Sequence, residues 1–253
     1  MTATTPTTKS ALILGATGAT GKHLLRNLLA SPHFSRVGEY GRRVTPADQL
    51  GGEIPPKLVQ KTVDFEKIGE AGLAEGKWDV VFVTLGTTRK AAGSAEAFEK
   101  IDREYVINSA RAAKSNDPSH SQRIVYCSSG GANASSSMLY MRSKGLTENG
   151  LAALGYADTI VFRPGYLKNA ERGGSRLAET VLAPVMNALS LVSSSLQIDV
   201  EVLAKGMRLA GQLGSSALPP SAQASRAGPS NAQFTLIGNS GALALGKMAD
   251  EDS

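Results

Sequence analysis

The sequence has little cysteine, no long apolar run and no run of like charges. Cys127 is the single cysteine among 253 residues, which excludes an internal disulfide framework and favours a reducing compartment. No apolar run approaches the roughly 18 to 20 residues of a membrane span. The three histidines (His23, His33 and His120) are scattered, so we expect no metal site.

The charge balance is only mildly basic. The chain has 27 Lys and Arg against 22 Asp and Glu, a net charge of +5. Long basic runs are absent, so we expect no nucleic-acid partner, and the surplus favours an anionic small ligand or an acidic surface. Apolar residues at 42% indicate a soluble globular protein with a core. Residues 1–10 lack the apolar segment of a secretory signal and are predicted to form a disordered tail.

Short apolar runs alternate with amphipathic stretches through the first two thirds of the chain. This alternation predicts an α/β fold of the Rossmann type, a doubly wound parallel sheet with helices on both faces. We expect a single domain over residues 11–248. The predicted strands are Ala11–Leu14, Val37–Tyr40, Leu58–Val63, Val80–Leu85, Arg123–Cys127 and Thr159–Phe162, and the predicted helices are His23–Leu29, Phe98–Lys114 and Leu139–Leu154.

The last third of the chain has a different composition. Residues 166–213 are expected to form most of a small substrate lobe. Residues 214–233 are rich in Ser, Ala, Pro and Gly and are predicted to be a flexible insertion, with a tail at 249–253. The further elements predicted here are helices at Leu177–Val192 and Val200–Leu213 and a last strand at Phe234–Ile237.

A glycine-rich segment joins the first predicted strand to the first predicted helix. A glycine at the strand end permits a tight turn, a second permits close approach to a pyrophosphate, and a third permits helix–strand packing. The helix N-terminus then presents free N–H groups to the anion. The alternative is an ordinary glycine-rich turn, but the position favours a dinucleotide site. The residues predicted to bind it are Gly15, Thr17, Gly18, Ala19, Thr20 and Gly21.

The end of the second predicted strand indicates which dinucleotide is bound. NAD-selective folds place a carboxylate there to accept from the ribose 2′-hydroxyl. Here the strand leads into Gly41, Arg42 and Arg43, and Glu39 lies inside the strand. Two guanidiniums suit a 2′-phosphate, which favours NADPH. The alternative is a solvated basic turn.

Two further strand ends are predicted to contact the cofactor. Asp64 and Phe65 follow the third strand, where such folds commonly contact adenine, although Phe65 is equally compatible with the core. Leu85, Gly86 and Thr87 end the fourth strand. A glycine there lets the backbone pass close to the cofactor's phosphates and ribose, and the alternative is a simple loop glycine.

A tyrosine and a lysine share one face of a predicted helix. Tyr140 and Lys144 are four residues apart, and a neighbouring ammonium favours ionisation of a phenol, whose unperturbed pKa is near 10. The preceding strand ends in Ser128 and Ser129, and either hydroxyl is placed to anchor a substrate carbonyl. Tyr140, Lys144 and Ser129 are the predicted catalytic residues. The alternative is that both serines cap a turn.

Two residues after the sixth strand complete the predicted site. Leu167 follows a Pro-Gly corner and is expected to present its backbone to the nicotinamide. Arg176 lies in a glycine-rich loop and is predicted to reach a cofactor phosphate, with a solvated loop arginine as the alternative.

Together these motifs resemble the atypical branch of the short-chain dehydrogenase/reductases, and within it the family of the human Tat-interacting protein. The resemblance implies an NADPH-binding Rossmann fold with Tyr140 as proton donor. It also implies a cytoplasmic protein with possible peripheral contact with the mitochondrial outer membrane, as for fungal members. The motifs that carry the resemblance are Leu12–Gly21, Gly41–Arg43, Val63–Lys67, Leu85–Arg89, Tyr140-x-x-x-Lys144 and Phe162–Gly165.

Two functional hypotheses remain open from the sequence. The first is an NADPH-dependent oxidoreductase that transfers hydride to a carbonyl or conjugated small molecule. The second is a redox-silent NADPH-binding regulator that acts through a protein partner, since the family includes members described chiefly as regulators. The sequence predicts either a monomer or a homodimer and does not predict the substrate.

Overall fold

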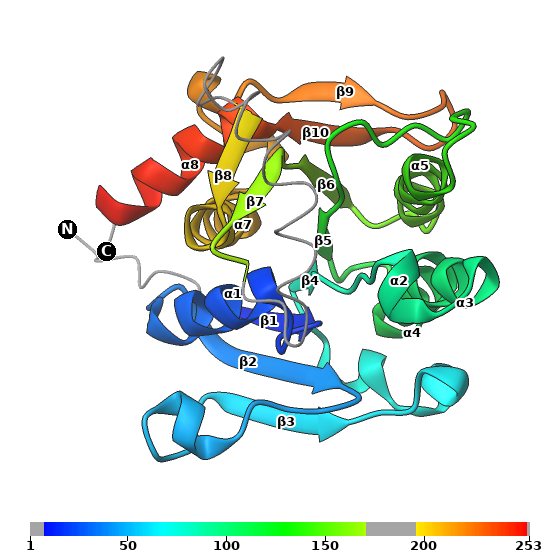
Figure 1. Ribbon diagram of the computed structural model, residues 1–253. Coiled ribbons are helices and arrows are strands. Elements are labelled where there is room, and N and C mark those ends of the chain that lie inside the picture. The colour runs from blue at the N-terminus through cyan, green and yellow to red at the C-terminus, as the bar shows by residue number, and fades with distance from the viewer. Residues whose placement is uncertain (1–7, 171–195, 252–253) are drawn as a thin grey trace.

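The computed structural model describes residues 8–170 and 196–251, and its centre is an eight-stranded sheet. Figure 1 shows the sheet edge to edge, in the order β3-β2-β1-β4-β5-β6-β10-β9. All neighbouring strands are parallel except β9, which runs antiparallel to β10. The strand bounds are β1 Lys9–Leu14, β2 Phe34–Gly41, β3 Leu58–Thr62, β4 Val80–Val83, β5 Arg123–Cys127, β6 Asp158–Arg163, β9 Ser225–Ala227 and β10 Phe234–Gly238.

Helices cover both faces of this sheet (Figure 1). One face carries α1 (Ala19–Ala30), α7 (Val200–Leu213) and α8 (Asn239–Glu251). The other carries α2 (Arg89–Ala92), α3 (Ala95–Glu99), α4 (Tyr105–Ala113) and α5 (Leu139–Ala152). A π-helical turn, η4 (Lys100–Glu104), joins α3 to α4. The remaining elements are the 3-10 helices η1 Ala47–Leu50, η2 Phe65–Glu70, η3 Leu73–Gly76, η6 Ser215–Ala217 and η7 Pro220–Ala222, and a two-stranded parallel sheet of β7 Tyr166–Lys168 and β8 Gln197–Asp199.

The two faces have separate hydrophobic cores because alternate strand residues point to opposite sides. In β1, Ala11 and Ile13 pack into the core beneath α1, α7 and α8. Leu12 and Leu14 pack into the core beneath α4 and α5. A strand buried on both faces reads as a continuous apolar run, which explains why the sequence predicts these strands well. The predicted Rossmann-type fold is confirmed.

The segment 214–233 differs from its prediction as a flexible insertion. It contains η6, η7 and β9, and residues 225–227 of β9 pair with β10. Ala222 is fully buried, and the backbone of this segment lies so close to α8 that a Cβ on Gly241 would be 1.9 Å from the Ala222 carbonyl oxygen. Backbone pairing and close packing of small residues therefore order a segment whose composition suggests a loop.

Other boundaries shift by a few residues. Lys9 and Ser10 belong to β1 rather than to the tail, since Lys9 N donates to His33 O at 2.8 Å. Helix α8 continues through residues 249–251, which were expected to be tail. The predicted helix Leu177–Val192 lies outside the described residues, as does much of the segment 166–213. Over the described ranges, no helix is long and apolar enough to cross a membrane.

Candidate functional site

The turn between β1 and α1 is built on glycines that lie against the end of β4. Gly15 has φ +97°, and a Cβ there would lie 2.7 Å from Leu85 N. A Cβ on Gly21 would lie 2.0 Å from Gly15 O. Gly18 N donates to Gly15 O at 3.0 Å, which closes the turn. Gly15 and Gly21 therefore cannot be replaced without a shift of the backbone. Without side chains at these positions, a ligand can approach the backbone of the turn closely.

The first turn of α1 has the features of an anion-binding helix N-terminus. Its N-cap is Gly18, which supplies no side-chain cap, and no acidic residue lies in the first turn. Uncapped N–H groups and the positive end of the helix dipole both favour a negatively charged group at this point. Thr17 is exposed beside it, whereas Thr20 and Gly21 face the protein interior.

A cavity of about 190 Å³ lies at the carboxyl ends of β1, β2, β3 and β4. Its walls come from four loops that are far apart in the sequence. It gathers eight of the predicted cofactor contacts, together with Ala16, Gly41 and Thr84, which were not among the predicted contacts. The lining residues are Gly15, Ala16, Thr17, Gly18, Gly41, Arg42, Arg43, Phe65, Thr84, Leu85 and Gly86.

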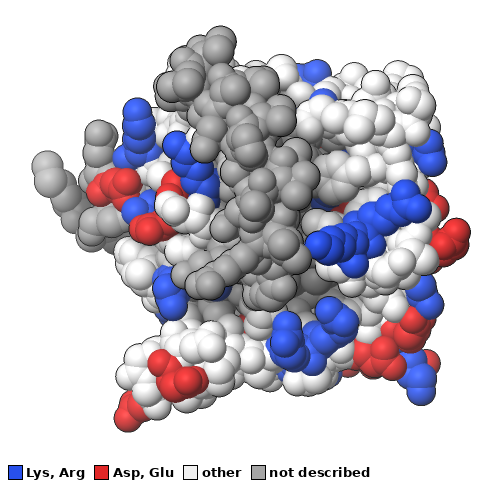
Figure 2. All heavy atoms as spheres, viewed as in Figure 1, with Lys and Arg blue, Asp and Glu red and all other residues white. Residues whose placement is uncertain are grey.

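Arg42 and Arg43 give this cavity its charge. Both side chains are exposed, and neither forms an ion pair within the part of the chain that the structure describes. Figure 2 shows Lys and Arg side chains spread over this face, several of them beside its centre, while Asp and Glu lie mainly toward its margins. The guanidiniums are therefore available to an anionic ligand.

The carboxylate of Glu39 is not available to a ribose. It is 1% exposed and accepts hydrogen bonds from Thr45 N at 2.8 Å, Thr45 Oγ1 at 2.7 Å and Gln60 Nε2 at 2.7 Å. These bonds tie the end of β2 to the following loop. Glu39 therefore makes its hydrogen bonds inside the protein and is not positioned to accept one from a ribose 2′-hydroxyl.

Asp64 and Phe65 have different surroundings. Phe65 lines the cavity and is also part of the core, where its ring stacks on Tyr105 with centroids 5.4 Å apart. Asp64 is exposed and caps η2, accepting from Glu66 N at 2.9 Å. The structure places Phe65 in the cavity wall and gives Asp64 a capping role outside it.

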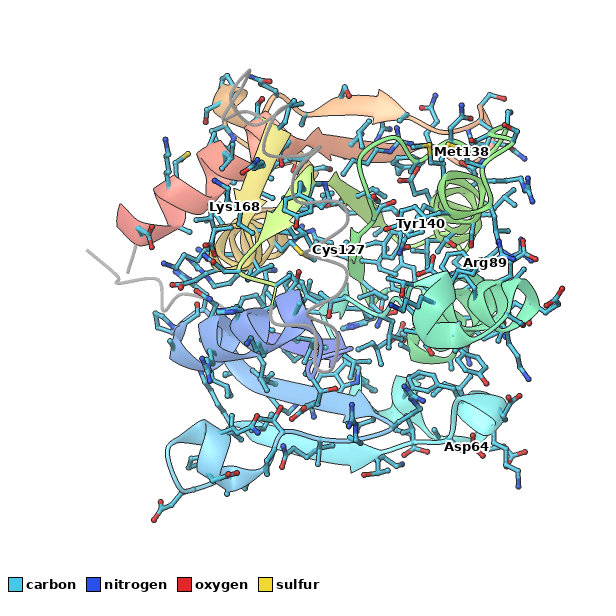
Figure 3. The ribbon with its side chains drawn as sticks, viewed as in Figure 1. Asp64, Arg89, Cys127, Met138, Tyr140 and Lys168 are labelled. Carbon is cyan, nitrogen blue, oxygen red and sulfur yellow. The ribbon has the colours of Figure 1, made fainter. Side chains whose placement is uncertain are left out.

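Tyr140 and Lys144 lie one turn apart near the start of α5. Tyr140 is 40% exposed, and its ring contacts Phe98 of α3 with centroids 5.9 Å apart. Lys144 is buried, with Nζ 5.9 Å from the centroid of the Tyr140 ring. Figure 3 shows Cys127, at the end of β5, near the middle of the view, and Tyr140 between α5 and α2.

The Lys144 ammonium has two buried partners that sequence reasoning missed. Nζ lies 3.0 Å from Asp102 Oδ1 and donates to the Tyr126 hydroxyl at 3.2 Å. Burial alone lowers the pKa of Lys144, but Tyr126, Asp102 and Tyr140 together raise it above its ordinary value. One signal was present in the sequence, because Asp102 falls on the buried face of its helix with Val106 and Ala110.

Gly86 connects the cavity to this lysine. A Cβ on Gly86 would lie 3.2 Å from Asp102 Oδ1 and 3.3 Å from Lys144 Nζ. The next residue, Thr87, donates its backbone N–H to Asp102 Oδ1 at 3.2 Å. The loop after β4 is therefore shared by the predicted cofactor cavity and the predicted catalytic pair.

The two serines after β5 are not equivalent. Ser128 is buried and donates to Glu148 Oε1 at 2.5 Å, and the same carboxylate is paired with Arg163. Ser129 is half-buried, and among the described residues its hydroxyl contacts only Gly130 O, at 3.3 Å. Ser128 therefore links the end of β5 to α5, whereas the Ser129 hydroxyl is the better placed of the two to hydrogen-bond a substrate.

Eight of the predicted cofactor residues that the structure describes do not line the cavity: Ala19, Thr20, Gly21, Asp64, Thr87, Tyr140, Lys144 and Leu167. Leu167 lies in β7, pairs with Ile198 of β8 and packs against the core beneath α1, α7 and α8. Arg176 lies outside the described residues. A second hollow, of about 420 Å³, lies beside α5 and includes Glu148, Arg163 and Phe234 but no predicted site residue.

Comparisons with known proteins found a family match and several relatives. A family described as NAD(P)H-binding matches residues 15–187. Protein HTATIP2 of Rattus norvegicus is 42% identical over 173 residues, 67% of this chain and 69% of that protein. The mitochondrial protein fmp52 of Emericella nidulans is 33% identical over 185 residues, 73% of this chain and 78% of that protein.

Solved structures show the same fold at low sequence identity. The short-chain dehydrogenase/reductase YIR035C of Saccharomyces cerevisiae has a TM-score of 0.64 and 14% identity, covering 91% of this chain and 96% of that one. The enzyme WbmF of Bordetella bronchiseptica, solved in complex with NAD+, has a TM-score of 0.61 and 14% identity, covering 97% and 78%.

Proposed function

Because the chain belongs to the NAD(P)H-binding family that includes HTATIP2 and the fungal FMP52 proteins, we propose that it is an NADPH-dependent oxidoreductase. The observation that carries this proposal is the position of Gly86. It lines the cavity with Arg42 and Arg43, and its backbone also lies against Lys144. A dinucleotide extending from the two arginines toward Gly86 leads to the Tyr140–Lys144 pair.

The residues of the cavity fit the phosphates of such a cofactor. Gly15 and Gly21 form a cradle that a Cβ would fill, and the uncapped N-terminus of α1 faces it. Arg42 and Arg43 would hold the 2′-phosphate that distinguishes NADPH from NADH, while Glu39 is occupied elsewhere. When bound, the cofactor supplies a hydride to an electrophilic carbon of the substrate.

The protein's own residues would manage the accompanying proton. Tyr140 would donate its phenolic proton to the substrate oxygen as the hydride reaches the carbon, and the partial exposure of this residue is compatible with that role. Lys144 would hold the cofactor's ribose and stabilise the phenolate that Tyr140 becomes. Ser129 would hydrogen-bond the same substrate oxygen, because the Ser128 hydroxyl is committed to Glu148.

The substrate in this proposal is a small carbonyl or conjugated molecule, acted on by a monomer or homodimer. For location, we propose a cytoplasmic protein that associates peripherally with the mitochondrial outer membrane. The fungal relatives named as mitochondrial support the organelle. Fractionation of cells, with protease treatment of intact mitochondria, tests this: the protein should be digested without rupture of the outer membrane.

Oxidation of NADPH with a panel of aldehydes, ketones and quinones tests the reaction. Tyr140→Phe keeps the ring against Phe98 and removes the proton, so turnover should fall by about 10² to 10⁴ with little change in NADPH affinity. Ser129→Ala should also lower turnover, whereas Ser128→Ala should mainly lower stability. Near-normal activity of Tyr140→Phe would remove this residue from the mechanism. Tight NADPH binding with no turnover on any substrate would favour the redox-silent regulator.

A further inference from the structure

A carboxylate is buried where the helix following β4 departs from α-helical geometry. Residues 95–113 form a continuous helix in which η4 makes a π-helical turn, and Asp102 lies in that turn with 0% of its surface exposed. Turns of this kind are frequent at functional sites. The charge on Asp102 therefore needs an explanation beyond the packing of its helix.

The contacts of Asp102 are unevenly distributed between its two oxygens. Oδ1 lies 3.0 Å from Lys144 Nζ and accepts from Thr87 N at 3.2 Å. Oδ2 is buried and has no hydrogen-bond partner among the described residues. A buried carboxylate with one oxygen unsatisfied is costly, and replacing such pairs by apolar residues is often neutral or stabilising. Stability alone is thus a poor reason for this arrangement.

The geometry restricts a side chain that is otherwise flexible. A lysine has a long stem with many rotamers, and its ammonium carries no directional preference of its own. Asp102 and the Tyr126 hydroxyl approach Nζ from within the protein, and the backbone of Gly86 lies next to it. Any movement of Lys144 away from Asp102 would change its distance from both the cavity and Tyr140.

We propose that Asp102 is a positioning residue that fixes Lys144 beneath Gly86 and ties it to the loop that forms the cofactor cavity. Through Oδ1 it joins the Thr87 backbone and the ammonium, so the loop and the lysine are held as one unit. The role of Lys144 toward the cofactor rests on the proposed function. The contact between Asp102 and Lys144 does not.

A double-mutant cycle on NADPH affinity tests the proposal. Asp102→Asn keeps the shape and the acceptor for Thr87 N but removes the charge that holds Lys144. We expect it to raise the NADPH Kd about tenfold, the loss of roughly one charge-assisted hydrogen bond. In a Lys144→Met background the same substitution should change Kd by less than about twofold, because there is no ammonium left to position. Glu201→Gln, which breaks the partly exposed pair with Lys205 on α7, is the matched control and should leave Kd unchanged.

A purely structural role predicts a different pattern. If Asp102 only shapes the π-helical turn and the Thr87 loop, Asp102→Asn would weaken NADPH binding equally in both backgrounds, and the proposal would be overturned. An unchanged Kd in the presence of Lys144 would overturn it as well. Asp102→Glu is measured beside Asp102→Asn in the background that keeps Lys144. Because it keeps the negative charge, it should bind NADPH more tightly than Asp102→Asn.

Unfolding in urea provides a readout that does not depend on the cofactor. Lys144→Met leaves the Asp102 charge buried without a cation, so it should unfold at a lower urea concentration than the double variant Asp102→Asn/Lys144→Met. If the wild type fails to bind NADPH, the proposed function is wrong, yet this comparison still tests the pair. A Lys144→Met protein as stable as the double variant would show that the two side chains do not interact.

Discussion

Replacing Gly15 by alanine should damage the site more than replacing any glycine that only turns the chain. Gly15 has φ +97°, a region that costs an L-residue about 1–2 kcal/mol. A Cβ there would also lie 2.7 Å from Leu85 N and 2.8 Å from the Thr84 carbonyl carbon. Overpacking of this kind costs about 1–3 kcal/mol, so we expect a loss of about 2–5 kcal/mol in the free energy of unfolding.

Gly51 provides a control that separates strain from steric overlap. It has φ +93°, close to that of Gly15, but a Cβ there would meet nothing within 4 Å. Gly51→Ala should therefore cost only the conformational part, about 1–2 kcal/mol. Urea unfolding of both variants, followed by NADPH titration of the folded proteins, measures both effects. Gly15→Ala should also weaken NADPH binding at least tenfold, because the loop after β4 must move, whereas Gly51→Ala should bind normally.

The comparison can refute the structural reasoning directly. If Gly15→Ala loses no more stability than Gly51→Ala, the end of β4 does not press on the β1–α1 turn as the structure shows. If it loses stability but binds NADPH normally, the turn is not part of the cofactor cradle.

Two further predictions concern the rest of the chain. Deletion of residues 215–230 should lower the free energy of unfolding, because it removes β9 and the buried Ala222, and a deletion that leaves stability unchanged would restore the interpretation as an inserted loop. The pKa of Lys144 is raised above its ordinary value of 10.5, so its stabilising contribution is complete below that value and is lost only as the pH rises through the higher folded-state pKa. The difference in unfolding free energy between wild type and the double variant Asp102→Asn/Lys144→Met, which leaves no unpaired buried carboxyl to titrate, should therefore be the same at about pH 7 and about pH 9. A difference that shrinks by pH 9 would show that the buried ammonium loses its proton in this range.

Local patterns predicted the parts of the site that one segment supplies. The Gly15–Gly21 turn, the Arg42–Arg43 pair and the Tyr140–Lys144 spacing each lie within a few residues, and each depends on backbone geometry that the sequence dictates locally. The same holds for strands buried on both faces, whose apolar runs do not depend on their neighbours.

Contacts between distant segments were not predictable in this way. Asp102 and Lys144 come from different helices, and Tyr126 joins them from β5. Ser128 and Ser129 look alike in sequence, and only the packing of Glu148 separates them. The prediction of a flexible insertion at 214–233 was wrong for a related reason, because backbone pairing with β10 orders the segment without large apolar side chains.

Comparing the affinities of the protein for NADPH and NADH tests the central claim most directly. Each guanidinium of Arg42 and Arg43 would contribute a charge-assisted bond of about 1.5–3 kcal/mol to the 2′-phosphate. Wild type should therefore bind NADPH at least tenfold more tightly than NADH, and replacing both arginines by alanine should abolish that preference while leaving NADH binding little changed. A wild-type protein that binds NADH as tightly as NADPH would contradict the account.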